Sequence, residues 1–364
     1  MSRRTLLLAA LATSVGSRFA GAAGEPKEIR IDWATYNPVS MVLKEQGLLE
    51  KEFAGDGIAI RWVQTLGSNK ALEFLNAGSI DFGSTAGAAA LIGKLRSGAI
   101  GFEADLTTVS TASQMRELTP KRIRWKETTG LIMRQRIIKD AEELKLIRAA
   151  VKLGAKVYLD ALESLRPGIS EVEVAARLEY AARQGGADAM SFETIVAAGK
   201  RGALPHGRAS SASVPKRGLV VIDSGVILRG YCSDMTRTVH VGRVGRVERE
   251  WYKAVLDAQL AGISAVRPGA TAGEVDAASR SLLHKAKLDR YFTHSTGHGV
   301  GLEIHEPPRL GKAQPETLQP GMVITIEPGI YVPGKGGIRI EDMVVVTSRG
   351  ADVLTPVTKE LIEL

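Results

Sequence analysis

Cysteine is nearly absent from this chain of 364 residues, since Cys232 is the only one. An internal disulfide and a zinc site built from cysteines are therefore excluded. Aromatic residues are also scarce, at 5%, and no dense basic run accompanies the net charge of +8. A nucleic-acid-binding protein is therefore not indicated, and a soluble globular protein of two or three domains is expected. Beyond the N-terminus, no stretch is apolar enough to cross a membrane.

The first 22 residues have the pattern of a signal peptide. Arg3 and Arg4 precede an apolar run from residue 6 to residue 15, and Ala20-Gly21-Ala22 fits a cleavage site between small residues. "SRRTLLL" resembles a twin-arginine signal, which exports folded proteins, and an ordinary secretory signal fits equally well. We expect a periplasmic or secreted protein without a membrane span in the mature chain.

Residues 23–97 alternate between strand-like and helix-like stretches. Strands are expected at 28–34, 58–65 and 80–85, with helices at 40–53 and 68–79. This βαβαβ order is typical of an open α/β sheet. "LKEQGLLEKEF" and "LNAGSIDFGSTAGAAA" resemble the first part of periplasmic solute-binding proteins of the sulfonate, nitrate and taurine type. The resemblance ends after about seventy residues, so only part of one lobe of such a protein is present.

Residues 139–364 contain an internal repeat. "ESLRPGISEVEVAARLEYAARQGG", from Glu163, matches "SAVRPGATAGEVDAASRSLLHKAK", from Ser264. In each copy a capping box follows Arg-Pro-Gly, formed by Ser170 with Glu173 and by Thr271 with Glu274. Each half then continues into apolar strands. The repeat predicts an α+β domain of two similar halves, with a site between them.

The residues able to carry chemistry lie in five short stretches. Half of the six histidines fall within "FTHSTGHGVGLEIHEPPRL", which begins at Phe292. The other stretches are "LVVIDSGVILRGYCSDMTRTVHVG", "VITIEPGIYV", "GGIRIEDMVVV" and "LPHGRAS". Together they supply His206, Asp223, Asp234, His294, His298, His305, Glu327, Arg339 and Glu341.

Four of these residues are carboxylates that the apolar pattern would bury. Asp223 and Asp234 end or begin two strand-like runs of an expected hairpin, where they could face each other. Glu327 and Glu341 also lie beside apolar strands, where an unpaired carboxylate is costly. Two divalent cations would neutralise the four charges, and His298 can add a neutral nitrogen ligand. Such a hard ligand set favours Mn²⁺ over Zn²⁺, although Co²⁺, Fe²⁺ or Zn²⁺ could also bind.

These motifs are similar, in order and context, to those of the pita-bread metallopeptidases. The resemblance covers about 225 residues, and "GHGVGLEIHEPPR", "TIEPGIY" and "GIRIEDM" are closest to the branch of Xaa-Pro aminopeptidases and prolidases. It implies a catalytic domain of duplicated αβ halves over residues 139–364. It also implies that Asp223, Asp234, His298, Glu327 and Glu341 are the ligands of two metal ions.

The remaining segment, residues 98–138, resembles the end of the N-terminal domain that precedes the catalytic domain in these peptidases. We therefore interpret the chain as a fusion of two truncated pieces, joined near Lys94 to Ala99, within "KLRSGAI". The smaller N-terminal α/β domain would then be built from a fused fragment. A homodimer is also expected, because the family's enzymes are often oligomeric.

The resemblance also implies a role for each remaining site residue. His206 and His305 would contact the scissile peptide and stabilise the tetrahedral intermediate, and His294 would line the substrate pocket. Glu327 would both bind metal and shuttle a proton, and Arg339 would orient carboxylates and contact the substrate site. A hydroxide bridging the two ions would attack the peptide carbonyl. We read His240, His284 and Cys232 as structural residues.

Three functions remain open on the sequence. The preferred one is an aminopeptidase that removes the residue before proline from short peptides. The second is a prolidase restricted to Xaa-Pro dipeptides, which would need a cleft closed beyond the second residue. The third is a periplasmic binding protein for a sulfonate-type solute, in which the peptidase part is inactive.

Overall fold

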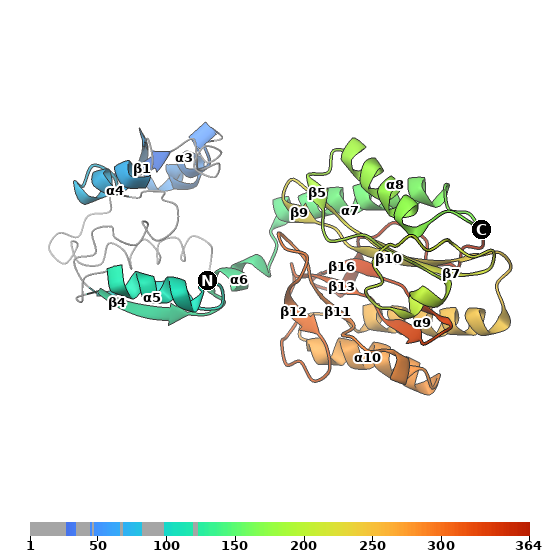
Figure 1. The fold of residues 1–364 in the computed structure, drawn as a ribbon. Coiled ribbons are helices and arrows are strands. Elements are labelled where there is room, and N and C mark those ends of the chain that lie inside the picture. Colours follow the sequence, from blue (N-terminus) through green and yellow to red (C-terminus); the bar gives the residue numbers. More distant parts are fainter. Residues whose placement is uncertain (1–26, 34–43, 46, 66–67, 82–97, 119–122) are drawn as a thin grey trace. The chain divides into compact units, whose positions relative to one another are not determined.

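The computed structural model describes residues 27–33, 44–45, 47–65, 68–81, 98–118 and 123–364 (Figure 1). The predicted signal peptide and most of the predicted junction lie outside these residues. The chain divides into two compact units, Met1–Leu131 and Ile132–Leu364. In the described part of both units, no helix has the length and apolar character needed to cross a bilayer.

The described part of the first unit contains two pairs of parallel strands. β1 (Glu28–Trp33) pairs with β2 (Ala59–Gln64), and β3 (Gly98–Glu103) pairs with β4 (Ile123–Thr128). The other described elements of this unit are α3 (Leu48–Phe53), η1 (Ala54–Asp56), α4 (Ser68–Asn76) and α5 (Val109–Leu118). α6 (Leu131–Arg136) lies at the boundary, with all but its first residue in the second unit.

The strands expected at 28–34 and 58–65 and the helix expected at 68–79 are therefore present as β1, β2 and α4. Of the expected helix at 40–53, the described part is α3 with residues 44–45. The expected third strand at 80–85 lies outside the described residues beyond Asp81, whose carboxylate pairs with Arg30 of β1 at 2.7 Å. The solute-binding resemblance and the boundary at residue 98 stay predictions.

Each half of the second unit begins with a pair of helices. These are α7 (Ala141–Leu162) with α8 (Glu171–Gln184), and α9 (Arg246–Ala265) with α10 (Ala272–Lys285). Both predicted capping boxes are present at the starts of α8 and α10, and Asp140 with Glu143 forms a third at the start of α7. In both Arg-Pro-Gly turns the glycine has a positive φ, 89° at Gly168 and 85° at Gly269.

The strands of this unit form two main sheets. The first has the order β10-β7-β6, and the second has the order β12-β11-β13-β16-β17. In the view of Figure 1, α7 and α8 lie on one side of the strands, and α9 and α10 lie on the other. The strands of these sheets are β6 (Ile195–Ala198), β7 (Gly218–Ser224), β10 (Met235–Val241), β11 (Gly297–Gly299), β12 (Glu306–Leu310), β13 (Val323–Ile326), β16 (Asp342–Val346) and β17 (Ala351–Val353).

Smaller elements complete the unit. They are β5 (Ala189–Met190), β8 (Val226–Leu228), β9 (Tyr231–Cys232), the hairpin of β14 (Gly329–Val332) and β15 (Gly336–Arg339), and the short helices η3 (Gly199–Ala203) and η4 (Asp289–Tyr291). Cys232 is buried at 1% exposure, as expected for a structural residue.

The two halves meet along β10. The backbone N–H of Glu341, which follows β15, donates to the carbonyl of Thr236 at 3.1 Å. The N–H of Arg339 donates to the hydroxyl of Thr238 at 3.0 Å. Strand ends from both halves are thereby brought to one place, although the two strands are about a hundred residues apart in the sequence.

Candidate metal centre

The five predicted metal ligands all stand at or near strand ends of the second unit. Asp223 lies near the end of β7, Asp234 directly precedes β10, and His298 is the middle residue of β11. Glu327 follows β13, and Glu341 stands between β15 and β16. All five line one cavity of about 770 Å³, together with the predicted His206, His294, His305 and Arg339.

The pairing of the two aspartates differs from the expectation that they face each other. In the β7–β10 register, Asp223 lies opposite Thr236, and Asp234 lies just beyond the last pair, Met235 with Ser224. The two aspartates are therefore diagonal neighbours on one face of the sheet. Side chains two positions apart share a face, which keeps both carboxylates in the cavity.

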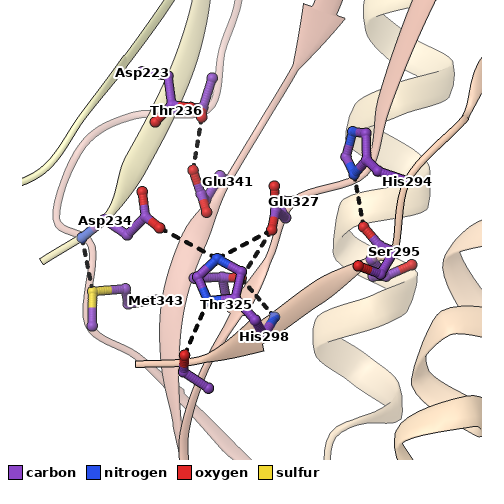
Figure 2. Close-up of polar contacts among 12 residues, drawn as sticks. Asp223, Asp234, Thr236, His294, Ser295, His298, Thr325, Glu327, Glu341 and Met343 are labelled. Carbon is purple, nitrogen blue, oxygen red and sulfur yellow. Dashed lines mark hydrogen bonds and ion pairs between the residues drawn. The ribbon is translucent and has the colours of Figure 1, made fainter. Parts of the chain in front are cut away.

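The His298 imidazole has a fixed orientation. Its Nδ1 lies 3.0 Å from the carbonyl oxygen of Gly299, which can only accept, so Nδ1 carries the proton. Nε2 then presents a lone pair toward Asp234 at 3.5 Å and Glu327 at 3.4 Å, as Figure 2 shows. Burial lowers the pKa of His298 to about 4, so the ring is neutral at neutral pH.

The carboxylates of this cluster are strongly disfavoured as anions. Burial raises the pKa of Glu327 to about 8. Burial, and then the charge of Glu341, raise the pKa of Asp234 well above its usual range, and burial raises that of Glu341 likewise. Two neutral hydroxyl groups donate to these carboxylates (Figure 2). The hydroxyl of Thr236 donates to Glu341 at 2.7 Å, and that of Thr325 donates to Glu327 at 3.3 Å. These neutral hydroxyls do not balance the negative charge of the carboxylates.

One cation from the protein does reach the cluster. Arg339, 3% exposed, donates from Nη2 to Oδ2 of Asp223 at 2.6 Å and from Nε to the Thr236 hydroxyl at 3.0 Å. The other oxygen of Asp223 is buried without a partner in the described structure. An unpaired buried carboxylate oxygen is costly, and a bound cation would satisfy it.

These observations fit a divalent metal site. One ligand atom each from Asp234, His298 and Glu341 lies within 4.8 Å of the others. Asp223 and Glu327 adjoin this group and add the orphaned oxygen and a second carboxylate. A set of hard oxygen ligands with one imidazole is what Mn²⁺ and similar ions accept.

Three histidines surround the cluster without belonging to it. His294 is held by Tyr331, whose hydroxyl lies 2.8 Å from its Nε2, and burial lowers the pKa of His294 to about 4. The His305 ring stands edge-on to His298, with ring centroids 4.4 Å apart. His206 follows η3 on the first half and is exposed to the cavity. Histidines from both halves thus face one space.

Sequence reasoning missed several residues of the site. Tyr331, in the quoted "GIYV", bridges Arg339 and His294. Its hydroxyl accepts from Arg339 at 2.6 Å and donates to Nε2 of His294 at 2.8 Å, since Nδ1 of that ring donates to the carbonyl of Ser295. Thr236 and Thr325 each bond a carboxylate of the cluster. Glu306, next to His305, also lines the cavity. Their positions within the motifs were visible, but their partners come from distant strands, and no local pattern indicates those contacts.

The comparisons with known proteins agree with this geometry. Residues 145–348 match metallopeptidase family M24. The chain is 45% identical over 238 residues to a Xaa-Pro dipeptidase of Pyrococcus furiosus, an alignment that covers 65% of this chain and 68% of that protein. Overall the chain spans about two thirds of the length of the curated relatives that it matches.

Solved structures extend the match. A Xaa-Pro dipeptidase from Bacillus anthracis superposes with a TM-score of 0.75 at 37% identity and covers 92% of this chain and 86% of its own. An X-Pro aminopeptidase from Thermotoga maritima gives a TM-score of 0.75 at 28% identity, covering 93% and 88%. Alignments of this extent reach beyond the second unit, so part of the first unit also resembles these peptidases in fold.

Proposed function

Because this chain belongs to metallopeptidase family M24 and has its pita-bread fold, we propose that it is a metal-dependent peptidase that hydrolyses Xaa–Pro bonds, with Xaa-Pro dipeptides as substrates. The observation that carries the proposal is the convergence of Asp234, His298 and Glu341 beside the orphaned oxygen of Asp223. We choose Xaa-Pro dipeptides as substrates because the similar proteins from Pyrococcus furiosus and Bacillus anthracis are Xaa-Pro dipeptidases.

Five residues would hold the metal: Asp223, Asp234, His298, Glu327 and Glu341. Four carboxylates call for two divalent ions by charge balance, and Mn²⁺ is the metal we propose. When bound, such ions lower the pKa of a water molecule and polarise the carbonyl that it attacks.

The protein's own groups would supply the remaining steps. His206 and His305 face the cavity from the two halves and can donate hydrogen bonds to the oxygen that becomes negative as the carbonyl is attacked. Glu327 can accept the proton of the attacking water and pass it to the leaving proline nitrogen. Arg339 fixes Asp223, so that the carboxylate keeps one oxygen directed into the cluster.

The test compares two substrates and one variant. Full-length protein is incubated with Ala-Pro and with Ala-Pro-Pro, with added Mn²⁺ or with EDTA, beside Glu327→Gln and the exposed control Glu179→Gln. Cleavage of Ala-Pro that requires Mn²⁺, and that only Glu327→Gln abolishes, is expected. A folded, Mn²⁺-loaded protein that cleaves neither peptide would overturn the proposal.

The second candidate is the aminopeptidase. The superposition on the Thermotoga X-Pro aminopeptidase favours it, because that match is as close in TM-score as the match to the Bacillus dipeptidase. A kcat/KM for Ala-Pro-Pro well above that for Ala-Pro would select it.

We also propose that residues 1–22 direct export, because two arginines, an apolar run and a small-residue site follow in order. Fractionation of the native host followed by mass measurement would test this, since the mature chain would begin at residue 23. Size-exclusion chromatography of that chain tests the expected homodimer.

A further inference from the structure

The segment that carries His305 ends on a fully buried carboxylate. Glu306 directly follows His305, begins β12, and has a side chain with 0% exposure. Its Oε1 accepts from the backbone N–H of Glu303 at 3.1 Å, and its backbone pairs with Gly299 of β11. A Cβ added to Gly301 would lie 2.6 Å from its Oε2. The carboxylate therefore sits directly against the backbone of the loop at residues 300–305.

Two cations from the start of the second unit bind this carboxylate. Lys139, whose side chain is 2% exposed, donates to Oε2 at 3.0 Å, and Arg136 donates to Oε1 in a very close contact. Arg136 also lies 3.4 Å from Glu303 in the same loop. Ion pairs removed from water hold their geometry tightly, because separating the charges leaves each one desolvated.

Lys139 is itself fixed in place. Its N–H donates to the carbonyl of Gly321, and it directly precedes Asp140, the N-cap of α7. The α7 capping box thus anchors the backbone that presents the ammonium group. Both oxygens of Glu306 are engaged by these cations, so this carboxylate is not available to a metal ion even though it lines the same cavity.

We propose that Arg136, Lys139 and Glu306 form a clamp that positions His305 over the metal centre. The clamp joins the segment at residues 136–139, where the second unit begins, to the loop that places the His305 ring against His298. Glu306 is a positioning residue, since it acts through His305. The proposal rests on the proposed peptidase function for its catalytic consequence, but not for the loop geometry.

The kinetic test is a double-mutant cycle with Glu306→Gln and His305→Ala, using Ala-Pro and saturating Mn²⁺. Misplacement of a catalytic group by about 1 Å can cost on the order of 100-fold. We expect Glu306→Gln alone to lower kcat by about 10- to 100-fold with a smaller change in KM. In the His305→Ala background it should cause no further loss. An equal loss in both backgrounds would overturn the clamp. Arg148→Gln, which breaks the exposed pair with Asp352, is the control and should leave kcat unchanged.

A second variant covers the case in which Glu306→Gln does not fold. Lys139→Met combined with Glu306→Gln removes the buried lysine charge together with the buried carboxylate, which avoids an uncompensated Lys139. This double variant should fold and show the same loss of kcat. A folded double variant with wild-type kcat contradicts the proposal.

Hydrogen exchange tests the clamp without any activity. In Glu306→Gln, amides at residues 301–306 should exchange faster, while those of β13 and β16 keep their protection. Unchanged exchange at 301–306 rules the clamp out. If the wild-type protein cleaves no Xaa-Pro peptide but the exchange effect is present, the proposed function has failed and the clamp stands.

Discussion

Arg339 and Asp223 form a buried ion pair that leaves the carboxylate half satisfied. Nη2 of Arg339 donates to Oδ2 at 2.6 Å, while Oδ1 has no partner in the described structure. The arginine also bonds Thr236, Tyr331 and the carbonyl of Pro205, so its position is fixed from several strands. A pair of this kind presents one carboxylate oxygen in a set direction.

Arg339→Met should therefore weaken metal binding. Loss of such an orienting partner typically costs 10- to 100-fold in metal affinity, and we expect about that loss for Mn²⁺. Titration calorimetry with the EDTA-stripped protein measures it. Arg349→Met removes an exposed arginine of the same domain and should bind Mn²⁺ as the wild type does. Equal affinities in the two variants would contradict the role given to Arg339.

The metal-free protein should lose stability as the pH rises. The folded-state pKa of Glu327 is about 8, above its ordinary value of 4.5, so the folded state binds the extra proton. This contribution to the free energy of unfolding is fully present below pH 4.5 and is lost as the pH rises through 8. Between those two pKa values, the loss is about 1.4 kcal/mol per pH unit. Denaturant titrations of EDTA-treated protein between pH 5 and 8.5 measure this. Glu327→Gln should flatten the slope, and an unchanged or steeper slope in that variant would refute the assignment.

The contribution of His294 to the stability of the metal-free protein should change with pH in the opposite direction, and fall as the pH falls. Its folded-state pKa is about 4, below the ordinary 6.5, because burial disfavours the charged ring. The stability from this neutral histidine is present above pH 6.5 and is lost as the pH falls through 4. His294→Gln should remove this component from the unfolding free energy of metal-free protein. His284→Gln, at a side chain 77% exposed, should retain it.

Arg237→Met should destabilise the second unit strongly. Arg237 is 2% exposed and donates to Asp342 at 2.7 Å, as well as to the carbonyls of Val357, Thr358 and Glu341. Removing one partner from a buried pair costs about 3–5 kcal/mol. Urea unfolding measures the change. Arg249→Met breaks the exposed pair with Glu363 and should cost about 1 kcal/mol or less; equal costs would contradict the argument.

Gly297→Ala should displace the strand that carries His298. An added Cβ would lie 2.0 Å from the carbonyl oxygen of Thr325 on β13, and a backbone atom cannot move aside cheaply. We expect a loss of stability of about 1–3 kcal/mol or more, together with weaker Mn²⁺ binding. Gly311→Ala is the matched control, because its nearest neighbour is at 3.5 Å. Wild-type Mn²⁺ affinity in Gly297→Ala would show that β11 tolerates the shift.

Much of the local structure was predictable because its signals are local. The capping boxes at Ser170 and Thr271 and the strands around Asp223 and Asp234 follow from residue types at fixed spacing. The relative register of the two aspartates did not follow, since the pairing of β7 with β10 depends on hydrogen bonds across the sheet. For the first unit, the sequence predicted strands and helices that are present in the described residues. Its resemblance to a solute-binding protein, and its origin by fusion, stay predictions.

The sequence by itself determined the duplicated halves and the family, and it predicted the candidate ligands, because each rests on short motifs whose residues are close together in the chain. Only the tertiary structure decided which oxygens remain unsatisfied, which histidine nitrogen faces the carboxylates, and that Lys139 and Arg136 bind the carboxylate beside His305. Most of these contacts join residues that are far apart in the sequence. The free energy of burying their charges depends on neighbours that only the folded chain supplies.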